Sequence, residues 1–306
     1  MNPAASVIVF TVCAGAGYGL LIVTALAASL GLFAGRGDLV AWASGLAIAA
    51  IVTGLISSTL HLGRPLRAWR ALGQWRSSWL AREGVAALAG LPPAALFLGL
   101  SALGVWPWLA AAAGLVAAAL ALVTIVCTAM ISASLVPIAR WRSRWTPPVY
   151  VALALQSGTL LLASFAGGRA AGSAIFDWLA VAAIAAGWAL KTVYWRDRPD
   201  ERLARTTGLE SLERTRALAV EDGAPTFVHR EMLRTFPSER ARVARLFVQI
   251  ALFALPLALM AFALAGPASA AAPATWAATV SAAFGLGVER WLFFAEARHA
   301  VGVLHA

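Results

Sequence analysis

The sequence predicts an all-α, polytopic membrane protein with eight transmembrane helices and both termini on one side of the membrane. Composition is the first reason, because 61% of the 306 residues are hydrophobic and only 12% are charged, whereas a soluble domain averages about 25% charged residues. The second reason is the recurrence of apolar runs of about 20 residues, the length that a spanning helix needs. The third is that the basic residues fall almost entirely on one side of the resulting topology.

The predicted spans are separated by residues that end helices. They cover approximately 5–33, 40–61, 79–102, 107–136, 148–167, 174–195, 243–265 and 275–298, within a single membrane domain of residues 1–306. The first apolar run has no basic residues before it and is too long for a signal peptide, so it is expected to be an uncleaved helix. Abundant small residues inside the spans suit close helix packing in lipid. Pro92 and Pro93 predict a kink in the third span.

The charge distribution predicts the orientation. Eight spans place both termini and the loops 2–3, 4–5 and 6–7 on one side, called the basic side below. Arg36 and Arg169 fall on the opposite side, and the other 22 of the 24 Lys and Arg residues fall on the basic side or in the helix ends next to it. The positive-inside rule then predicts a multi-pass protein of the cell inner membrane with cytoplasmic N- and C-termini. The net charge of +10 is explained by cytoplasmic loops and anionic lipid, and does not indicate nucleic-acid binding.

Two further features fit this topology. Tryptophans flank both membrane boundaries, as in an aromatic belt: Trp69, Trp75, Trp79, Trp141, Trp145 and Trp195 on the basic side, and Trp106, Trp108 and Trp276 on the other. The one long loop, residues 196–242, mixes both charges with apolar residues, which predicts short amphipathic helices at the cytoplasmic surface. These helices would form either a cap on the lipid surface or a docking surface for a soluble partner.

Ionisable residues inside spans are costly, and are therefore candidates for function. Glu83 lies four residues after Trp79, roughly 6 Å into the third span. His61 ends the second span, which is expected to be the antiparallel neighbour of the third, so both side chains should lie at similar depth. They form either a simple hydrogen-bonded pair or a proton-coupled quinol site. In such a site the histidine hydrogen-bonds a quinone oxygen and the carboxylate accepts a proton.

Other charged residues are candidate contributors. Arg64, Arg67 and Arg70 in loop 2–3 could hold Glu83 ionised or contact lipid headgroups or a partner. In the last span Glu289, Glu296 and His299 share one helix face. Two alternatives to a functional role stay open there. Glu289 and the adjacent Arg290 could form a charge pair that fixes helix packing, and Glu296 with His299 could form a solvated helix end.

The cysteines and histidines exclude several redox groups from this chain. Cys13 and Cys127 lie inside apolar spans, and an Fe–S cluster needs several thiolates. A transmembrane haem needs two axial histidines within the spans. None of the four histidines, His61, His229, His299 and His305, lies near the centre of a span. We therefore expect no haem and no metal site, with Fe–S clusters and a Mo-pterin cofactor only in partner subunits.

Two segments, "HLGRPLRAWRALGQWRSSWLAREG" and "ERWLFFAEARH", closely resemble the DmsC family, the membrane anchor subunits of dimethyl sulfoxide reductase. The likeness extends over essentially the whole chain. It implies a haem-free anchor for a molybdopterin catalytic subunit and an Fe–S subunit, exchanging electrons with membrane quinone (menaquinone or ubiquinone). The family's quinol-site histidine and glutamate match His61 and Glu83. With no haem to carry electrons across, the quinone pocket is expected beneath loop 2–3, bordered by the second and third spans and the last.

One feature departs from the pattern of the respiratory reductases, in which the corresponding loops face the periplasm. Here those loops carry nearly all the arginine. This arrangement resembles that of a related branch, the SoeC-like membrane subunit of a cytoplasm-facing sulfite dehydrogenase, and therefore favours sulfite oxidation. An anchor of a sulfoxide or N-oxide reductase that oxidises menaquinol is the alternative. Outside this class, a transporter or proton channel and a purely structural anchor also fit the fold.

Overall fold

A computed structural model describes residues 4–33, 36–59, 65–136, 138, 140–167, 174–197 and 238–297. Among these residues every regular element is helical, and eight helices are long and apolar enough to cross a membrane. The prediction of an all-α protein with eight transmembrane helices is therefore confirmed. The spans are α1 (Ala5–Ser29), α2 (Gly37–Thr59), α3 (Trp79–Leu103), α4 (Pro107–Ala133), α5 (Thr146–Ala166), α6 (Ala174–Arg196), the continuous run α10 (Ser238–Val248), η3 (Gln249–Ala254) and α11 (Leu255–Ala265), and α12 (Ala268–Ala295).

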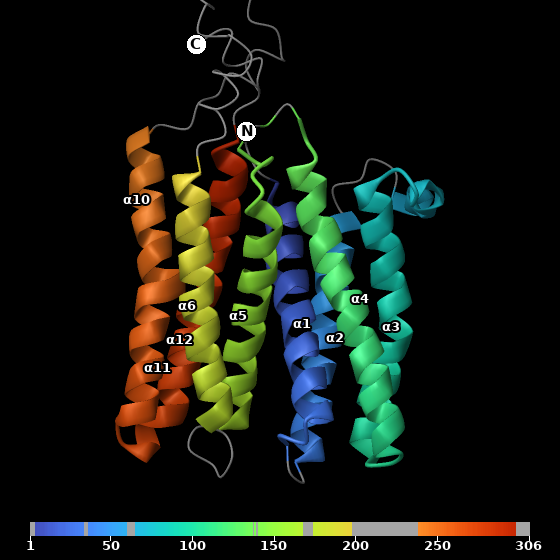
Figure 1. The fold of residues 1–306 in the computed structure, drawn as a ribbon, viewed down its shortest axis with the longest axis vertical. Coiled ribbons are helices and arrows are strands. Elements are labelled where there is room, and N and C mark those ends of the chain that lie inside the picture. The colour runs from blue at the N-terminus through green and yellow to red at the C-terminus, as the bar shows by residue number, and fades with distance from the viewer. Residues whose placement is uncertain are drawn as a thin grey trace, which may run out of the picture.

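The helices stand side by side, and consecutive spans run in opposite directions (Figure 1). A short 3₁₀ helix, η1 (Pro65–Gln74), lies across one end of the bundle, at the same end as the start of α10. Leu72 of η1 lies against α3 at Gly84, where an added Cβ would come within 2.8 Å of the leucine side chain. The side chain of Ser78 caps the start of α3 by accepting a hydrogen bond from the backbone N–H of Ala81. The residues around Glu83 are thereby held close to this end of the bundle.

Helix α1 lies at the centre of the packing, in contact with α2, α4, α5 and α12. Small residues let its backbone approach its neighbours closely. Gly19 of α1 meets Gly158 and Ala154 of α5, where an added Cβ would overlap backbone atoms. Gly17 meets α2 in the same way, 2.7 Å from the carbonyl oxygen of Ala47. These contacts fix the spacing of the helices that surround the site described below.

The seventh span contains a π-helical segment, η3, between α10 and α11. Two of its carbonyl groups accept hydrogen bonds from other helices. Gln156 Nε2 of α5 donates to Leu252 at 2.8 Å, and Ser281 Oγ of α12 donates to Ala251 at 2.8 Å. Gly285 of α12 allows the close approach, because a Cβ there would lie 2.5 Å from the Leu252 nitrogen. The wider helical turn is therefore stabilised by buried polar contacts with α5 and α12.

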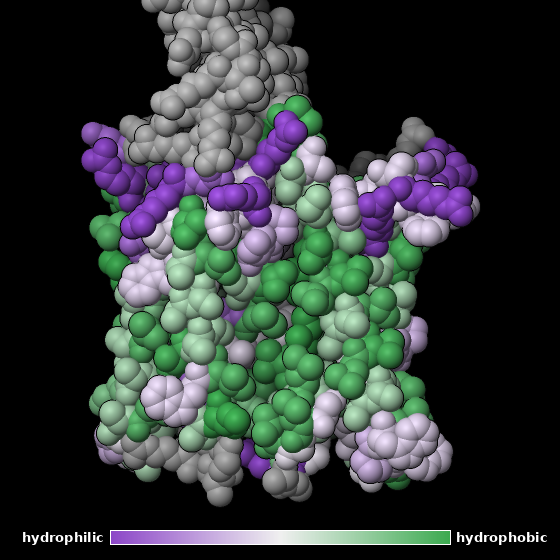
Figure 2. Space-filling model, in the orientation of Figure 1, coloured by the Kyte–Doolittle hydropathy of each residue, from purple (hydrophilic) through white to green (hydrophobic). Residues whose placement is uncertain are grey.

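Polar and apolar residues are segregated along the bundle. Figure 2 shows hydrophilic residues gathered at the end that carries η1 and α10, above a broad hydrophobic band. The described arginines of this end include Arg67, Arg70, Arg76, Arg82, Arg140, Arg142, Arg144, Arg196, Arg240, Arg242 and Arg245. One residue of the expected tryptophan belt does not fit. Trp141 is 7% exposed and donates through Nε1 to the carbonyl oxygen of Phe293, so it is a packing residue. Most of the expected loop 196–242 lies outside the described residues.

Candidate functional site

Glu83 is buried, at 5% exposure, one turn into α3 from the basic end of the bundle. Its side chain has a hydroxyl partner, since Thr128 of α4 is hydrogen-bonded to Glu83 Oε1. No salt bridge joins Glu83 to a basic residue within the described part of the chain. The neighbouring Arg82 instead donates to the carbonyl oxygens of Trp75 and Arg76. The carboxyl group is therefore held in the bundle by a neutral partner.

The Thr128 hydroxyl can serve both protonation states of this carboxyl group. It lies within hydrogen-bonding distance of Glu83 and, at 2.9 Å, of the carbonyl oxygen of Thr124, but a hydroxyl has one hydrogen to donate. When Glu83 is ionised, Thr128 donates to the carboxylate. When Glu83 is protonated, the carboxyl donates to Thr128 and Thr128 donates to Thr124. One rotating hydroxyl thus accommodates gain and loss of a proton at Glu83.

Several residues predicted for the site cannot be placed beside it. His61, Arg64 and His299 lie outside the described residues. Arg67 and Arg70 are described, in η1, and both are exposed. The Arg70 guanidinium lies 5.6 Å from the ring centroid of Trp69. Their described surroundings therefore suit contacts with a headgroup or partner better than contact with Glu83.

The last helix contributes a second buried polar group, formed by Lys191 of α6 with Glu289 and Arg290 of α12. One carboxylate oxygen of Glu289 pairs with Lys191 Nζ, and the other accepts from Arg290 Nε at 2.5 Å. All three residues are at most 3% exposed. The guanidinium lies 4.1 Å from the ring centroid of Tyr150, and the ammonium lies 4.3 Å from that of Tyr194. The expected charge pair of Glu289 and Arg290 is present, with Lys191 as an additional cation from another helix.

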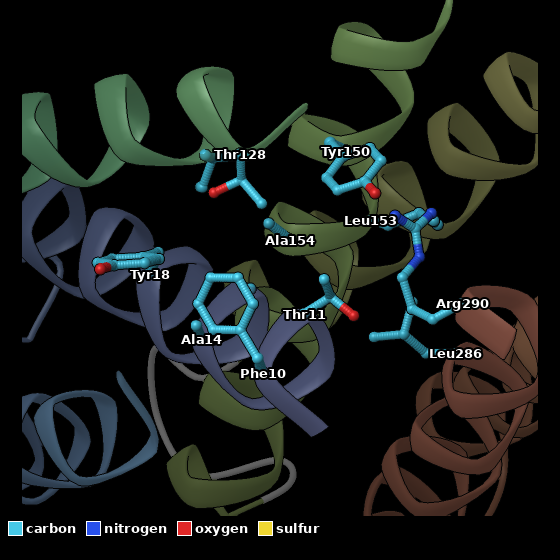
Figure 3. Close-up of a pocket in the computed structure, with 12 residues that line it drawn as sticks. Phe10, Thr11, Ala14, Tyr18, Thr128, Tyr150, Leu153, Ala154, Leu286 and Arg290 are labelled. Carbon is cyan, nitrogen blue, oxygen red and sulfur yellow. The ribbon is translucent and has the colours of Figure 1, made fainter. Parts of the chain in front are cut away.

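A cavity lies between Thr128 and Arg290, and Figure 3 shows these two residues on opposite sides of it. It contains about 420 Å³ of empty space and is partly open to the surroundings. Its lining comes from four helices: Phe10, Thr11, Ala14, Gly15 and Tyr18 of α1, Ile125 and Thr128 of α4, Tyr150, Leu153 and Ala154 of α5, and Leu286 and Arg290 of α12. This volume lies within the range of small-molecule sites, and an apolar lining with a few polar groups is typical of them.

The position of this cavity differs from the expected one. The last span borders it, as expected, but the second and third spans supply none of its lining. Glu83 reaches it through Thr128, whose residue both lines the cavity and is hydrogen-bonded to the carboxyl group. A proton at Glu83 is thus one hydroxyl away from the cavity.

Glu296 does not form the solvated helix end that was the alternative for it. It is 8% exposed and joins three segments at the basic end of the bundle. Arg140, from the α4–α5 connection, lies 3.3 Å from Oε2, and Arg245 of α10 lies 2.7 Å from Oε1. The carboxylate is buried because two arginines from other segments close over the end of α12. Glu296 is therefore a tie between α12 and its neighbours.

The sequence reasoning missed four residues of this region. Lys191 carried a signal, since it is an ionisable residue inside an apolar span. Thr128, Tyr18 and Tyr150 carried none, because hydroxyl residues are common in membrane helices and their roles follow only from tertiary placement.

Two comparisons with known proteins agree with this architecture. A family model described as DMSO reductase anchor subunit (DmsC) matches residues 1–194. A membrane-protein relative from Allochromatium vinosum, named as a subunit of sulfite dehydrogenase, is 29% identical over 328 aligned positions, which cover 98% of this chain and 97% of that protein. The family match includes α3 with Glu83 and α6 with Lys191, and the second alignment covers almost the whole chain, including most of α12.

Proposed function

The chain belongs to the DMSO reductase anchor subunit (DmsC) family, the membrane anchor subunits of multisubunit molybdoenzyme complexes, and from this premise we propose that it exchanges electrons and protons with membrane quinone. The electrons would pass to or from an Fe–S subunit, which serves a molybdopterin catalytic subunit. The terminal reaction would belong to the catalytic subunit. The anchor would supply the membrane attachment and the quinone site.

The buried Glu83–Thr128 pair beside the cavity is the observation that carries this proposal. Quinone supplies two-electron chemistry in which each ring oxygen gains or loses a proton. A residue that serves it must lie near the ligand, take up a proton and release it again. Thr128 lines the cavity and is hydrogen-bonded to Glu83, and its hydroxyl accommodates both states of the carboxyl group. Burial excludes bulk water from this exchange, while the position one turn from the basic end of α3 leaves a short path to solvent.

The residues present suit a quinone in two respects. The lining is mainly apolar, as a ring with a hydrocarbon tail requires, and hydroxyl groups or a guanidinium occur on both sides of the cavity. His61 is expected to act with Glu83, on the strength of the resemblance of its segment to the family's histidine, and its position lies outside the described residues. Thr128 and Glu83 would therefore act at one end of the ligand.

We further propose that the basic end faces the cytoplasm and that the complex oxidises sulfite. The concentration of arginine at that end supports the orientation. The relative named as a sulfite dehydrogenase subunit supports the substrate. Exposed Arg67, Trp69, Arg70, Trp75 and Arg76 in and beside η1 would form part of the docking surface for the Fe–S subunit. An exported catalytic subunit would instead favour sulfoxide or N-oxide reduction on the opposite side.

The test is quinone-linked electron transfer in the complete complex, purified with its native partners and placed in lipid nanodiscs. Glu83→Gln keeps the shape of the side chain but cannot gain or lose a proton. We expect it to lower kcat with decylubiquinone by roughly 10²-fold or more, while Mo and Fe content stay at the wild-type level. Glu239→Gln, at an exposed position of α10, is the matched control.

Three results would contradict the proposal. The first is a complex in which Glu83→Gln turns over quinone at the wild-type rate. The second is a chain that purifies as a stable protein without Mo or Fe–S partners. The third is a complete complex that does not react with decylubiquinone or with the corresponding quinol.

A further inference from the structure

Arg290 has a polar group that no described residue uses. Its Nε is bound to Glu289, whereas Nη2 is buried and has no hydrogen-bond partner in the described part of the chain. A buried N–H without a partner costs free energy, so such a group indicates a ligand or bound water that is absent from the protein alone. Arg290 also lines the cavity between α1, α4, α5 and α12. The unused donor is therefore part of a cavity wall.

We propose that Arg290 donates a hydrogen bond through Nη2 to one ring oxygen of a 1,4-quinone bound in this cavity, with the other oxygen directed toward Thr128 and Glu83. This inference rests on the quinone exchange proposed above, and it assigns a second binding residue on another helix. Figure 3 shows the Arg290 head group beside Tyr150, across the cavity from Thr128. A 1,4-quinone carries its two oxygens at opposite ends of the ring, which matches polar groups on opposite walls.

The guanidinium is held in place before any ligand binds. Glu289 fixes the Nε side, and Tyr150 lies against the group with a guanidinium-to-centroid distance of 4.1 Å. Lys191 occupies the second oxygen of Glu289, so that carboxylate cannot turn toward the cavity without breaking a buried ion pair. A donor that is fixed in advance loses little freedom on binding. Glu289 and Lys191 are therefore positioning residues for Arg290.

Charge indicates the kind of ligand. Lys191, Glu289 and Arg290 together carry two positive charges and one negative charge, and Arg290 presents only donors. The cluster therefore repels cations and favours an oxygen acceptor that becomes more negative as the ligand is reduced. A quinone carbonyl is such an acceptor, and a fixed donor at that position stabilises the charge that develops on it.

A second cavity offers space for the hydrocarbon tail. It has about 330 Å³ of empty space and is lined mainly by apolar residues of α1, α5 and α12, including Val12, Leu160, Leu161 and Ala282. Leu286 lines both cavities, and so it lies between the proposed ring site and this apolar space. An isoprenoid tail leaving the ring beside Leu286 would enter apolar surroundings.

The experiment uses the complete complex in nanodiscs and measures kcat and KM for decylubiquinone. Arg290→Gln removes the donor and leaves Lys191 and Glu289 as a balanced pair. We expect it to raise KM roughly 10- to 100-fold, the effect of losing a hydrogen bond from a charged group, with a smaller change in kcat. Arg290→Lys, which keeps the charge but not the planar group, should raise KM less. Arg245→Gln is the matched control, since it removes one of the two arginines on Glu296, and KM should not change.

A second variant covers the case in which Arg290→Gln does not assemble. Leu286→Trp fills the space between the two cavities and should abolish decylubiquinone binding while Mo and Fe content remain normal. An unchanged KM in Arg290→Gln, or in Leu286→Trp, would overturn the inference and show that Nη2 serves only bound water. If Glu83→Gln still blocks turnover in that case, the proposed function stands without Arg290. A wild-type complex that is inactive with quinone would instead refute the proposed function.

Discussion

Lys191 of α6 and Glu289 of α12 form an ion pair whose two side chains are 2% and 0% exposed. Arg290 places a second cation on the same carboxylate, at 2.5 Å. A membrane protein can keep such charges in its interior only when they compensate one another, because isolated charges are costly there. The single carboxylate therefore stabilises two cations, and removing it should have a larger effect than removing either of them.

The first prediction is this asymmetry in stability. Glu289→Gln leaves Lys191 and Arg290 buried without a counter-ion, and should lower the free energy of unfolding by about 3–5 kcal/mol. Lys191→Met keeps Glu289 paired with Arg290, so its cost should be about 1–2 kcal/mol. The measurement is the thermal unfolding midpoint of the complex in one detergent. Equal destabilisation by the two substitutions would contradict the proposed charge balance.

The second prediction concerns the hydroxyl of Thr128. Thr128→Val keeps the side-chain shape but removes the only described hydrogen-bond partner of the Glu83 carboxyl group. Proton transfer at Glu83 should then slow, and we expect kcat for decylubiquinone to fall roughly 10-fold or more. Thr128→Ser retains the hydroxyl and should keep most of the activity. The initial rate in nanodiscs, divided by Mo content, is the measurement.

Loss of activity in Thr128→Val has one competing explanation, a change in helix packing at the α3–α4 contact. The serine variant separates the two, because it removes a methyl group and keeps the hydroxyl. If Thr128→Ser loses as much activity as Thr128→Val, packing is the cause and the hydroxyl has no role in proton transfer.

The eight spans could be predicted because hydropathy and length depend on the sequence alone. The bounds differ where local chemistry decides. The first helix ends at Ser29, before a turn with Gly31 at φ 71°, and not at residue 33. The last begins at Ala268, because the alanine-rich stretch around Pro273 stays helical. The seventh begins at Ser238, since the polar α10 continues the helix beyond its apolar part.

The candidate site was less accessible to sequence reasoning. Glu83 and Glu289 were identifiable as charges inside apolar spans. The cavity was not, because α1, α4, α5 and α12 are far apart in the chain and meet only through packing at residues such as Gly19 and Gly158. Arg290 was visible as a charge, but the unused nitrogen that gives it a proposed role depends on which partners the fold brings to it.

The third prediction tests the helix crossing that sets this packing. Gly158→Ala places a Cβ against the backbone of Gly19, so we expect destabilisation of about 1–3 kcal/mol or failure to assemble. Gly99→Ala in α3 is the control, because nothing lies within 4 Å of a Cβ there. Both substitutions raise helix propensity, so the control should be neutral or gain up to about 1 kcal/mol. Similar unfolding midpoints for the two variants would show that α1 and α5 do not cross this closely.

The fourth prediction is the orientation, which separates the two proposed terminal reactions. In a variant without the free cysteines Cys13 and Cys127, a cysteine replaces either exposed Gln74 of η1 or Val105 between α3 and α4, which is 41% exposed. A membrane-impermeant maleimide should label Gln74→Cys only in inside-out vesicles, and Val105→Cys only in spheroplasts. The reason is that the arginine-rich end should stay in the cytoplasm. Partner subunits could shield Gln74, so the vesicles should also be stripped of peripheral proteins before labelling. Labelling of Gln74→Cys in spheroplasts would place the docking surface outside the cytoplasm and would favour an exported sulfoxide or N-oxide reductase over sulfite oxidation.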